Sequence, residues 1–338
     1  MMDEAEKAAA GRLPADPKSN VIPLNAAAKR KAELEPRVLT VQDLLKGSME
    51  RAMLHGDRPG VCTCGIAPID DAAGGICPGH CWLFGADTNW GKSSWLVMVA
   101  DENLKRSKKV LIVSSEDDED IYGDRLMARR ARVNAKRLRD GKLDKDESRR
   151  VADTANRAEL LPVYLDGRGR SAELIVRQVE GLIQQHSIDL VLYDYLQEFR
   201  AARRYQDERI ACREVAAMLR QVVKRQKKAG VIFSQITLKD GKKYPDKHSI
   251  RESRDVSNAA EVILLGFTPT ENVTDTDSGE VRVPKGTPCV LVDKVKHGPK
   301  GFTVLMDWDK ESACFNAVAP DLPPEAFRDP DPHWTERD

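Results

Sequence analysis

The sequence predicts an α/β fold with a mostly parallel central sheet. Two observations carry this prediction. From about residue 60, short and continuous apolar runs alternate with helical stretches, and such runs are typical of strands that helices cover on both faces. One run is followed by a Gly-Lys-Ser loop and then by a helical stretch, which is the arrangement of a phosphate-binding loop.

Composition narrows the classes of protein. The chain has 338 residues, enough for a large domain, and its 54 basic residues equal its 54 acidic residues. A chain without net charge binds nucleic acid only through a local basic patch. No apolar run approaches the roughly 18 residues of a membrane span, and the first residues include acids instead of a signal peptide's apolar core. We expect a cytoplasmic protein that contacts no membrane.

The ends of the chain are expected to lie outside the main fold. Residues 1–37 are rich in Ala, Lys, Glu and Pro and lack apolar periodicity, so we expect a disordered arm. Residues 38–57 are expected to form a linker helix whose apolar stripe needs a partner, on its own domain or on a neighbouring subunit. The stripe comprises Val41, Leu44, Leu45, Ser48 and Ala52. The main domain would span residues 58–317, and a flexible tail of prolines and charges would follow at 318–338.

Nine apolar runs of the main domain are predicted to form strands. Six are continuous and predict buried strands: CWLFG (81–85), VLIVSS (110–115), LPVYLD (161–166), IDLVLYDY (188–195), GVIFSQ (230–235) and AEVILLGF (260–267). Three later runs predict short strands at the end of the sheet: GEVRV (279–283), PCVLVDKVK (288–296) and GFTVLMDWD (301–309).

Seven cysteines, an odd number, argue against a disulfide framework. Cys62, Cys64, Cys77 and Cys81 lie close together in the sequence. Zinc is one interpretation, but the spacings C-x-C and C-x-x-x-C differ from the usual C-x2-C. Cys81 also opens a predicted strand, which favours a place in the core over a metal site.

Residues 86–94, ADTNWGKSS, follow a predicted strand and precede a predicted helix. Gly91 allows the backbone to approach a phosphate, and the free N–H groups at the helix start attract anions. Lys92 would neutralise phosphate charge, and the Ser93 hydroxyl would bind Mg²⁺. Ala86 stands where the usual loop begins with glycine, so a chance Gly-Lys-Ser stays an alternative. The predicted nucleotide-binding set is Ala86, Asp87, Thr88, Asn89, Trp90, Gly91, Lys92, Ser93 and Ser94.

Three polar residues end other predicted strands. Asp194 is a candidate ligand for Mg²⁺, although many strands end in Asp. Glu116 directly follows a strand and is a candidate general base for the water that attacks the γ-phosphate. Its acidic neighbours also fit an ordinary solvated turn. Gln235 is a candidate sensor of the γ-phosphate, or an ordinary surface amide.

Taken together, five stretches occur in the order found in one family. They are ADTNWGKSS, SSEDDEDIYGDRL, YDYLQ, FSQI and RESRDVSNAAEVIL, and a sixth, DKVKHGPKG, follows them. This ordered set resembles the RecA-like motor domain of DnaB-type replicative helicases over about residues 58–317. The family's phosphate loop commonly begins with alanine, which accounts for Ala86. The resemblance implies a RecA-like P-loop NTPase domain preceded by a short linker helix.

The resemblance also implies roles for the residues at the strand ends. Lys92, Ser93 and Asp194 would hold ATP and Mg²⁺. Glu116 would be the catalytic base, and Gln235 would couple the γ-phosphate to a DNA-binding loop.

Further positions match an arginine and a DNA-binding loop of the family. Arg125 matches an arginine near the nucleotide base, although the basic run 125–139 also fits a solvated helix face. Arg251, Glu252 and Arg254 match a loop that follows the phosphates of single-stranded DNA, with Arg254 where the family has glycine. From the residues alone, this loop also fits a helix cap with a local ion pair.

Two lysines match the pair that the family supplies across a subunit interface. Lys294 matches the family's lysine, and Lys296 stands at the position of its arginine finger. Lysine lacks the planar fork of arginine, so we expect slow ATP hydrolysis.

The resemblance implies an ATP-dependent DNA helicase, a hexameric ring that translocates on single-stranded DNA during replication. Its partners would be single-stranded DNA, five further copies of the chain and, through the family's N-terminal helical domain, a primase or helicase loader. The arm before residue 38 is too short and polar for that domain, so these last contacts are the least supported. A nucleotide-gated DNA-binding ring without unwinding activity and a RecA- or KaiC-like ATPase acting on protein are the alternatives.

Overall fold

The computed structural model describes residues 41–42, 45–46, 49, 60–157, 162–236, 245, 249–250, 260–274 and 281–318. The chain divides into two units, Met1–Arg58 and Pro59–Asp338. In the first unit, the five described residues are helical, as predicted for the linker helix. Val41, Leu45 and Met49 among them are exposed. The predicted arm at 1–37 and most of the predicted tail lie outside the described residues.

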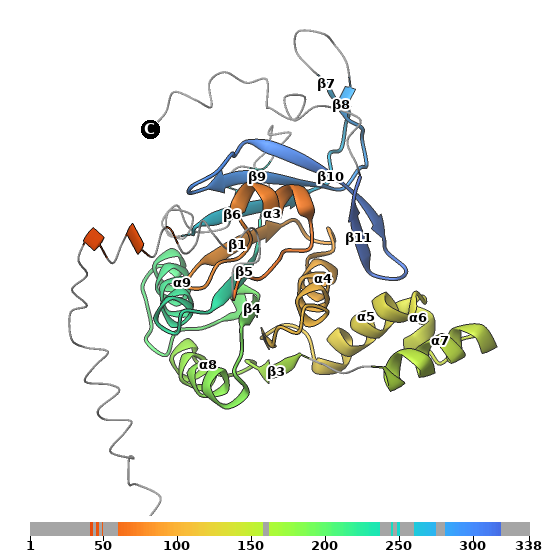
Figure 1. Cartoon of the computed structure of the whole chain (residues 1–338), viewed down its shortest axis with the longest axis horizontal. Helices are drawn as coiled ribbons and strands as arrows, with labels where there is room; N and C mark the ends of the chain where they lie inside the picture. The colour runs from red at the N-terminus through yellow and green to blue at the C-terminus, as the bar shows by residue number, and fades with distance from the viewer. Residues whose placement is uncertain are drawn as a thin grey trace, which may run out of the picture. The chain divides into compact units, whose positions relative to one another are not determined.

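The second unit is built on a nine-stranded sheet (Figure 1). The strand order is β11-β10-β9-β6-β1-β5-β4-β2-β3. The strands are β1 (Cys81–Ala86), β2 (Val110–Ser114), β3 (Val163–Asp166), β4 (Leu190–Asp194), β5 (Ala229–Gln235), β6 (Val262–Phe267), β9 (Cys289–Val295), β10 (Phe302–Asp309) and β11 (Cys314–Ala317). The first six are parallel, and the last three continue the sheet antiparallel. The predicted mostly parallel α/β sheet is confirmed.

All nine predicted apolar runs contain strands. The run at 279–283 contains β8 (Val281–Val283), which pairs outside the main sheet with β7 (Val273–Thr274). The sequence did not predict β7, because it is two residues long, or β11, which follows the turn after β10.

Helices cover both faces of the sheet (Figure 1). They are α3 (Ala67–Ala73), α4 (Lys92–Leu104), α5 (Glu119–Ala131), α6 (Ala135–Arg139), α7 (Lys145–Asn156), α8 (Ala172–His186) and α9 (Glu208–Arg225), with the 3-10 turn η1 (Leu196–Glu198). Side chains alternate along each strand, so Trp82 and Phe84 of β1 pack with α4 while Leu83 packs with α8 and α9. This two-sided burial explains why the strands read as continuous apolar runs.

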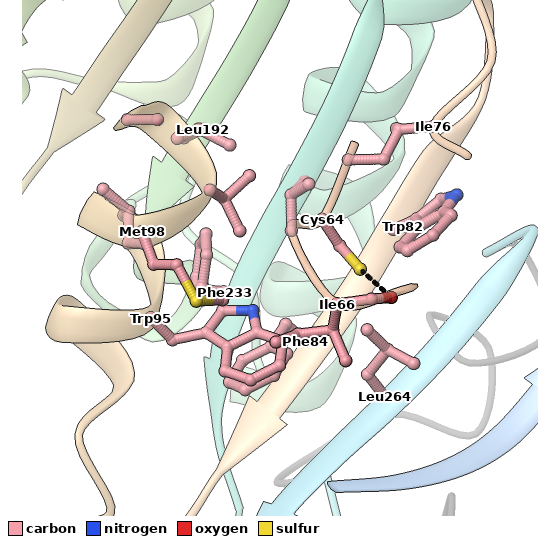
Figure 2. Packing of buried hydrophobic residues seen from close by; sticks show 14 of the residues in the cluster. Cys64, Ile66, Ile76, Trp82, Phe84, Trp95, Met98, Leu192, Phe233 and Leu264 are labelled. Atoms are coloured by element: carbon pink, nitrogen blue, oxygen red, sulfur yellow. Dashed lines mark hydrogen bonds between the residues drawn. The ribbon is translucent and has the colours of Figure 1, made fainter. Parts of the chain in front are cut away.

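The core beside α4 is strongly aromatic (Figure 2). Phe84 of β1 stacks on Trp95 of α4 at a ring-centroid distance of 5.0 Å, and it meets Phe233 of β5 at 5.4 Å. Trp95 is buried in the first turn of α4, directly behind the Gly-Lys-Ser loop. The aromatic packing therefore fixes the start of α4, the part of the helix that would face a phosphate.

Cys62 and Cys64 belong to this core, and Cys81 belongs to the core on the other face of the sheet, beside α8 and α9. All seven cysteines are free thiols, and Cys62, Cys64 and Cys81 are buried. Burial raises the pKa of the Cys62 thiol to about 12, and the Cys64 Sγ contacts the Ile66 carbonyl oxygen (Figure 2). Among the described residues, no group of three or more His, Cys, Asp or Glu side chains is placed to hold a metal ion.

In the described parts of the chain, no helix is both long and apolar enough to cross a membrane.

Candidate nucleotide-binding site

A cavity of about 390 Å³ lies where the carboxyl ends of β1, β2, β4 and β5 meet. Ligands of open parallel sheets bind at this edge. The described lining is Ala86, Asp87, Thr88, Asn89, Gly91, Lys92, Ser93, Ser94, Glu116, Asp117, Arg125, Tyr195, Gln235 and Trp308. Of the predicted nucleotide-binding loop, every residue except Trp90 faces this cavity.

Trp90 points the other way, into the core. It is buried, its Nε1–H donates to the Phe267 carbonyl oxygen at 2.9 Å, and its ring stacks on Phe315 of β11. A side chain at Gly266 would collide with this ring at 2.8 Å. Trp90 therefore anchors the loop 86–94 to β6 and β11, and its side chain lies outside the described lining of the cavity.

Gly91 is required at its position for two reasons. Its φ of +104° lies in the region that favours glycine. A Cβ atom there would lie 2.6 Å from the Trp308 ring and 2.9 Å from Phe315. Because Gly91 precedes α4 directly, the first N–H groups of this helix face the cavity without a side chain before them.

The Lys92 ammonium lies among three partners at the centre of the site. Its Nζ is 3.4 Å from Glu116 Oε2, 3.2 Å from Asp194 Oδ1 and 3.6 Å from the centroid of the Tyr195 ring. The three groups come from the ends of β2 and β4. The structure thus brings together the lysine, the candidate base and the candidate metal ligand that the sequence singled out.

Asp194 is fully buried, and its two carboxylate oxygens differ. The Tyr122 hydroxyl of α5 donates to Oδ2 at 2.8 Å, while Oδ1 accepts no hydrogen bond from the described residues and forms an ion pair with Lys92 at 3.2 Å. Burial and the Asp194 charge raise the pKa of Tyr122 far above its ordinary value, so the phenol remains a donor. Asp194 Oδ1 is therefore a suitable ligand for Mg²⁺, which takes oxygen ligands. Ser93, at the start of α4, would add a hydroxyl.

Glu116 combines partial exposure with a raised pKa. Its side chain is 44% exposed, so water reaches it. Burial of the remainder raises its pKa, Lys92 lowers it, and the negative charges of Asp194 and Asp117 raise it further. The net direction is upward, which suits a carboxylate that accepts a proton.

Gln235 reaches the phosphate loop. Its Nε2–H donates to the Thr88 hydroxyl oxygen at 2.6 Å. The end of β5 is itself held by Gln197 of η1, whose side-chain amide contacts Ser234 and the Gln235 backbone.

Arg125 lines the cavity from α5 and pairs with Asp117 at 2.8 Å. The basic run around it is not one solvated face. α5 ends at Ala131, α6 begins at Ala135, and Arg129 is buried against Asp101 at 3.1 Å. The alternative interpretation of the run 125–139 as an exposed helix face is therefore wrong for Arg129.

Lys294 and Lys296 lie away from this cavity. In the antiparallel pair of β9 and β6, Lys294 is opposite Ile263, whereas the phosphate loop follows Ala86, which is opposite Gly266. Ile263 and Gly266 are three residues apart on β6, so Lys294 lies roughly 10 Å along the strand from the start of the loop. Lys296 is exposed and lies still further from the loop, where its N–H donates to the Glu261 carbonyl oxygen at 2.9 Å.

Sequence reasoning missed Tyr122, Tyr195 and Trp308. Tyr195 directly follows Asp194, which was the available signal. Tyr122, which belongs to the SSEDDEDIYGDRL stretch, reaches the site from α5. Trp308 reaches it from β10, and nothing in the local sequence of Trp308 points to the site. The predicted DNA-contacting residues Arg251, Glu252 and Arg254 lie outside the described residues.

The parallel sheet, the β1–loop–α4 unit and the polar strand ends define the class of RecA-like α/β domains. The family model of the DnaB-like helicase C terminal domain matches residues 60–317. The chain belongs to this family.

Curated relatives agree with this membership. The chain is 24% identical over 273 residues to the replicative DNA helicase DnaB of Haemophilus influenzae, a match that covers 78% of this chain and 57% of that protein. It is 23% identical over 248 residues to the DnaB of Buchnera aphidicola, covering 71% of this chain and 52% of that protein. The chain thus spans about half the length of these curated relatives.

Two solved structures share the fold. One is "The Structure Of A DnaB-Like Replicative Helicase And Its Interactions With Primase", with a TM-score of 0.69 and 19% identity, covering 88% of this chain and 72% of that chain. The other is a separately solved ATPase domain, with a TM-score of 0.71 and 18% identity, covering 84% of this chain and 100% of that chain.

Proposed function

We propose that this chain is the motor of an ATP-dependent DNA helicase, a cytoplasmic hexameric ring that moves along single-stranded DNA during replication. The observation that carries the proposal is the convergence of Glu116, Asp194 and the Tyr195 ring on the Lys92 ammonium beside the phosphate loop. The motor would span residues 58–317, and the helix at 38–57, with Val41, Leu45 and Met49 exposed, would dock on a neighbouring subunit.

Each group has a proposed part in ATP hydrolysis. The first N–H groups of α4 and the Lys92 ammonium bind the phosphates, and Ser93 and Asp194 hold Mg²⁺. When bound, Mg²⁺ neutralises charge that develops on the β- and γ-phosphates. Lys92 is drawn to the phosphates, which leaves the Glu116 carboxylate free to orient a water and accept its proton.

The position of the two lysines supports a ring. Lys294 and Lys296 lie toward the other edge of the sheet from the phosphate loop of their own chain. They reach a γ-phosphate only if a second copy presents its cavity to this edge. We therefore assign them to the neighbouring subunit's site, with Arg125 beside the nucleotide base of the chain's own site.

The DNA-binding part of the proposal assigns Arg251, Glu252 and Arg254 to the phosphates of single-stranded DNA, with Glu252 orienting the arginines. Contacts of this kind bind without reading sequence. A primase or a helicase loader completes the proposed set of partners.

The test measures ATP hydrolysis with and without single-stranded DNA, at several salt concentrations. We expect hydrolysis that DNA stimulates, with a stimulation that weakens as salt rises. Glu116→Gln should lower hydrolysis by roughly 10²–10⁴-fold, while the matched change at exposed Glu119, in the first turn of α5, should leave it unchanged.

A forked-duplex assay separates the helicase from its closest alternative. Strand separation that requires ATP supports the proposal. Tight binding to single-stranded DNA without ATP-dependent separation supports a nucleotide-gated DNA-binding ring, which the lysine at Lys296 favours. Hydrolysis that DNA does not stimulate supports an ATPase acting on protein.

A further inference from the structure

The parallel sheet ends unevenly beside the candidate site. β4 ends at Asp194 and its pairing with β5 ends at Tyr193 opposite Ile232, but β5 continues to Gln235. On its other side, β5 remains paired with β1 up to Ala86 opposite Gln235. Among the described residues, the last residues of β5 therefore have a strand partner on one side only, and their remaining N–H and C=O groups need other partners.

The side chain of Gln197 fills this gap. Its Oε1 accepts from the Gln235 N–H at 3.2 Å, and its Nε2–H group donates to the Gln235 carbonyl oxygen at 3.2 Å. The same nitrogen donates to the buried Ser234 hydroxyl oxygen at 2.9 Å. An amide side chain has the donor and acceptor of a peptide group. Gln197 thus continues the ladder of β4 where the backbone of β4 has turned away.

Gln197 affects the site through a further contact, which the Gln235 side chain makes with the phosphate loop. Gln235, whose backbone Gln197 holds, directs its own Nε2–H group to Thr88 of the phosphate loop at 2.6 Å. Gln197 also belongs to η1, which begins two residues after Asp194. One side chain therefore connects the end of β4, with its metal-ligand candidate, to the residue that touches the loop.

We propose that Gln197 is a positioning residue that holds Gln235 against the phosphate loop. This inference rests on the proposed ATPase function of the site. Gln197 has no role in binding the nucleotide, because it is absent from the described lining of the cavity. Its effect passes through Gln235, so its loss should change turnover and leave ATP affinity unchanged.

The experiment uses Gln197→Leu, which removes the amide and keeps a similar volume. Exposed Gln184 of α8 provides the matched control, since Gln184→Leu makes the same chemical change away from the site. Gln235→Ala and the double variant Gln197→Leu/Gln235→Ala complete a double-mutant cycle. All are measured in the full chain for kcat, KM for ATP and amide hydrogen exchange.

We expect Gln197→Leu to lower kcat by roughly ten- to hundredfold, as misplacement of a catalytic group does, with KM within about twofold of the wild type. Because Gln197 acts through Gln235, the double variant should have the kcat of Gln235→Ala alone, within about twofold. Effects of the two changes that multiply would overturn the proposal, and so would an unchanged kcat in Gln197→Leu.

Hydrogen exchange tests the contact without relying on hydrolysis. Loss of one hydrogen bond of ordinary strength should speed exchange of the Gln235 amide by roughly fivefold or more, and Gln184→Leu should leave it unchanged. Unaltered exchange at Gln235 in Gln197→Leu overturns the proposal even if kcat falls. If the wild type hydrolyses no ATP, the proposed function fails, and the exchange rate still decides whether Gln197 holds Gln235.

Discussion

Replacement of Gly91 by alanine tests the link between the aromatic core and the phosphate loop. Two separate costs arise at this position. The φ of +104° is unfavourable for any L-residue, which costs about 1–2 kcal/mol. The new Cβ would lie 2.6 Å from Trp308 Cζ2, 2.8 Å from its Cη2 and 2.9 Å from Phe315 Cζ. Overpacking of this kind costs about 1–3 kcal/mol.

The sum predicts that Gly91→Ala lowers the free energy of unfolding by about 2–5 kcal/mol. For a domain of this size, each kcal/mol lowers Tm by roughly 2–4 °C, so we expect a Tm lower by roughly 4–20 °C. Thermal unfolding followed by circular dichroism or calorimetry measures the shift. Relief of the collision by movement of Trp308 would also displace the loop, so nucleotide binding should weaken in the same variant.

Two other glycines separate the two costs. Gly141 has a φ of +66°, and no atom of the described residues lies within 4 Å of the place a Cβ would take, so Gly141→Ala carries the backbone cost alone. At Gly266 the Cβ would meet Trp90 at 2.8 Å without a left-handed φ, so Gly266→Ala carries the collision alone. The loss in Gly91→Ala should approach the sum of the two. A Gly91→Ala protein as stable as Gly141→Ala would refute the packing of Trp308 against the loop.

Three further predictions concern the charged groups of the site. Because burial raises the pKa of Glu116 above its ordinary 4.5, and a general base acts only when deprotonated, ATP turnover should fall as pH falls through that raised value. The acid limb of the pH–rate profile should therefore lie above pH 4.5 and vanish in Glu116→Gln; a limb that persists in the variant contradicts this assignment. Lys296→Ala should lower turnover with little effect on ATP binding, and unchanged turnover would reject its action on a neighbour's site. Tyr122→Phe leaves a buried oxygen of Asp194 without its donor, so urea unfolding should show a loss of about 1–3 kcal/mol; a variant as stable as the wild type would show that another donor replaces the phenol.

The strands could be predicted because burial on both faces leaves a strong signal in the sequence. β1 and β6 are buried at every position, and both read as continuous apolar runs. β11 lacks this signal. Its Asn316 is exposed, and among the described strands β11 pairs only with β10, so the place of β11 depends on contacts of Cys314 and Phe315 with the core.

Much of the candidate site could be predicted because its residues occupy strand ends. In a parallel sheet these ends meet at one edge, so Lys92, Glu116, Asp194 and Gln235 are brought together by topology alone. Trp90 shows the limit of that reasoning. Trp90 belongs to the loop by position, but its side chain packs on Phe315. Phe315 lies on β11, a strand that the sequence did not predict.

The hydrogen-bond partners at these strand ends depend on where each strand stops relative to its neighbour, which the apolar pattern leaves open to within a residue or more. β4 and β5 read as equivalent runs, yet β5 extends beyond the end of their pairing. Because of that difference in length, the backbone N–H and C=O groups of Gln235 have no partner on β4. Gln197 affects the site because its side chain binds these two groups. Gln197 lies three residues beyond the end of β4, within the YDYLQ stretch, and its amide chemistry alone does not predict which backbone it contacts. The same amide becomes informative once the register is known, because it replaces the missing peptide group of β4 and thereby fixes the residue that touches the phosphate loop.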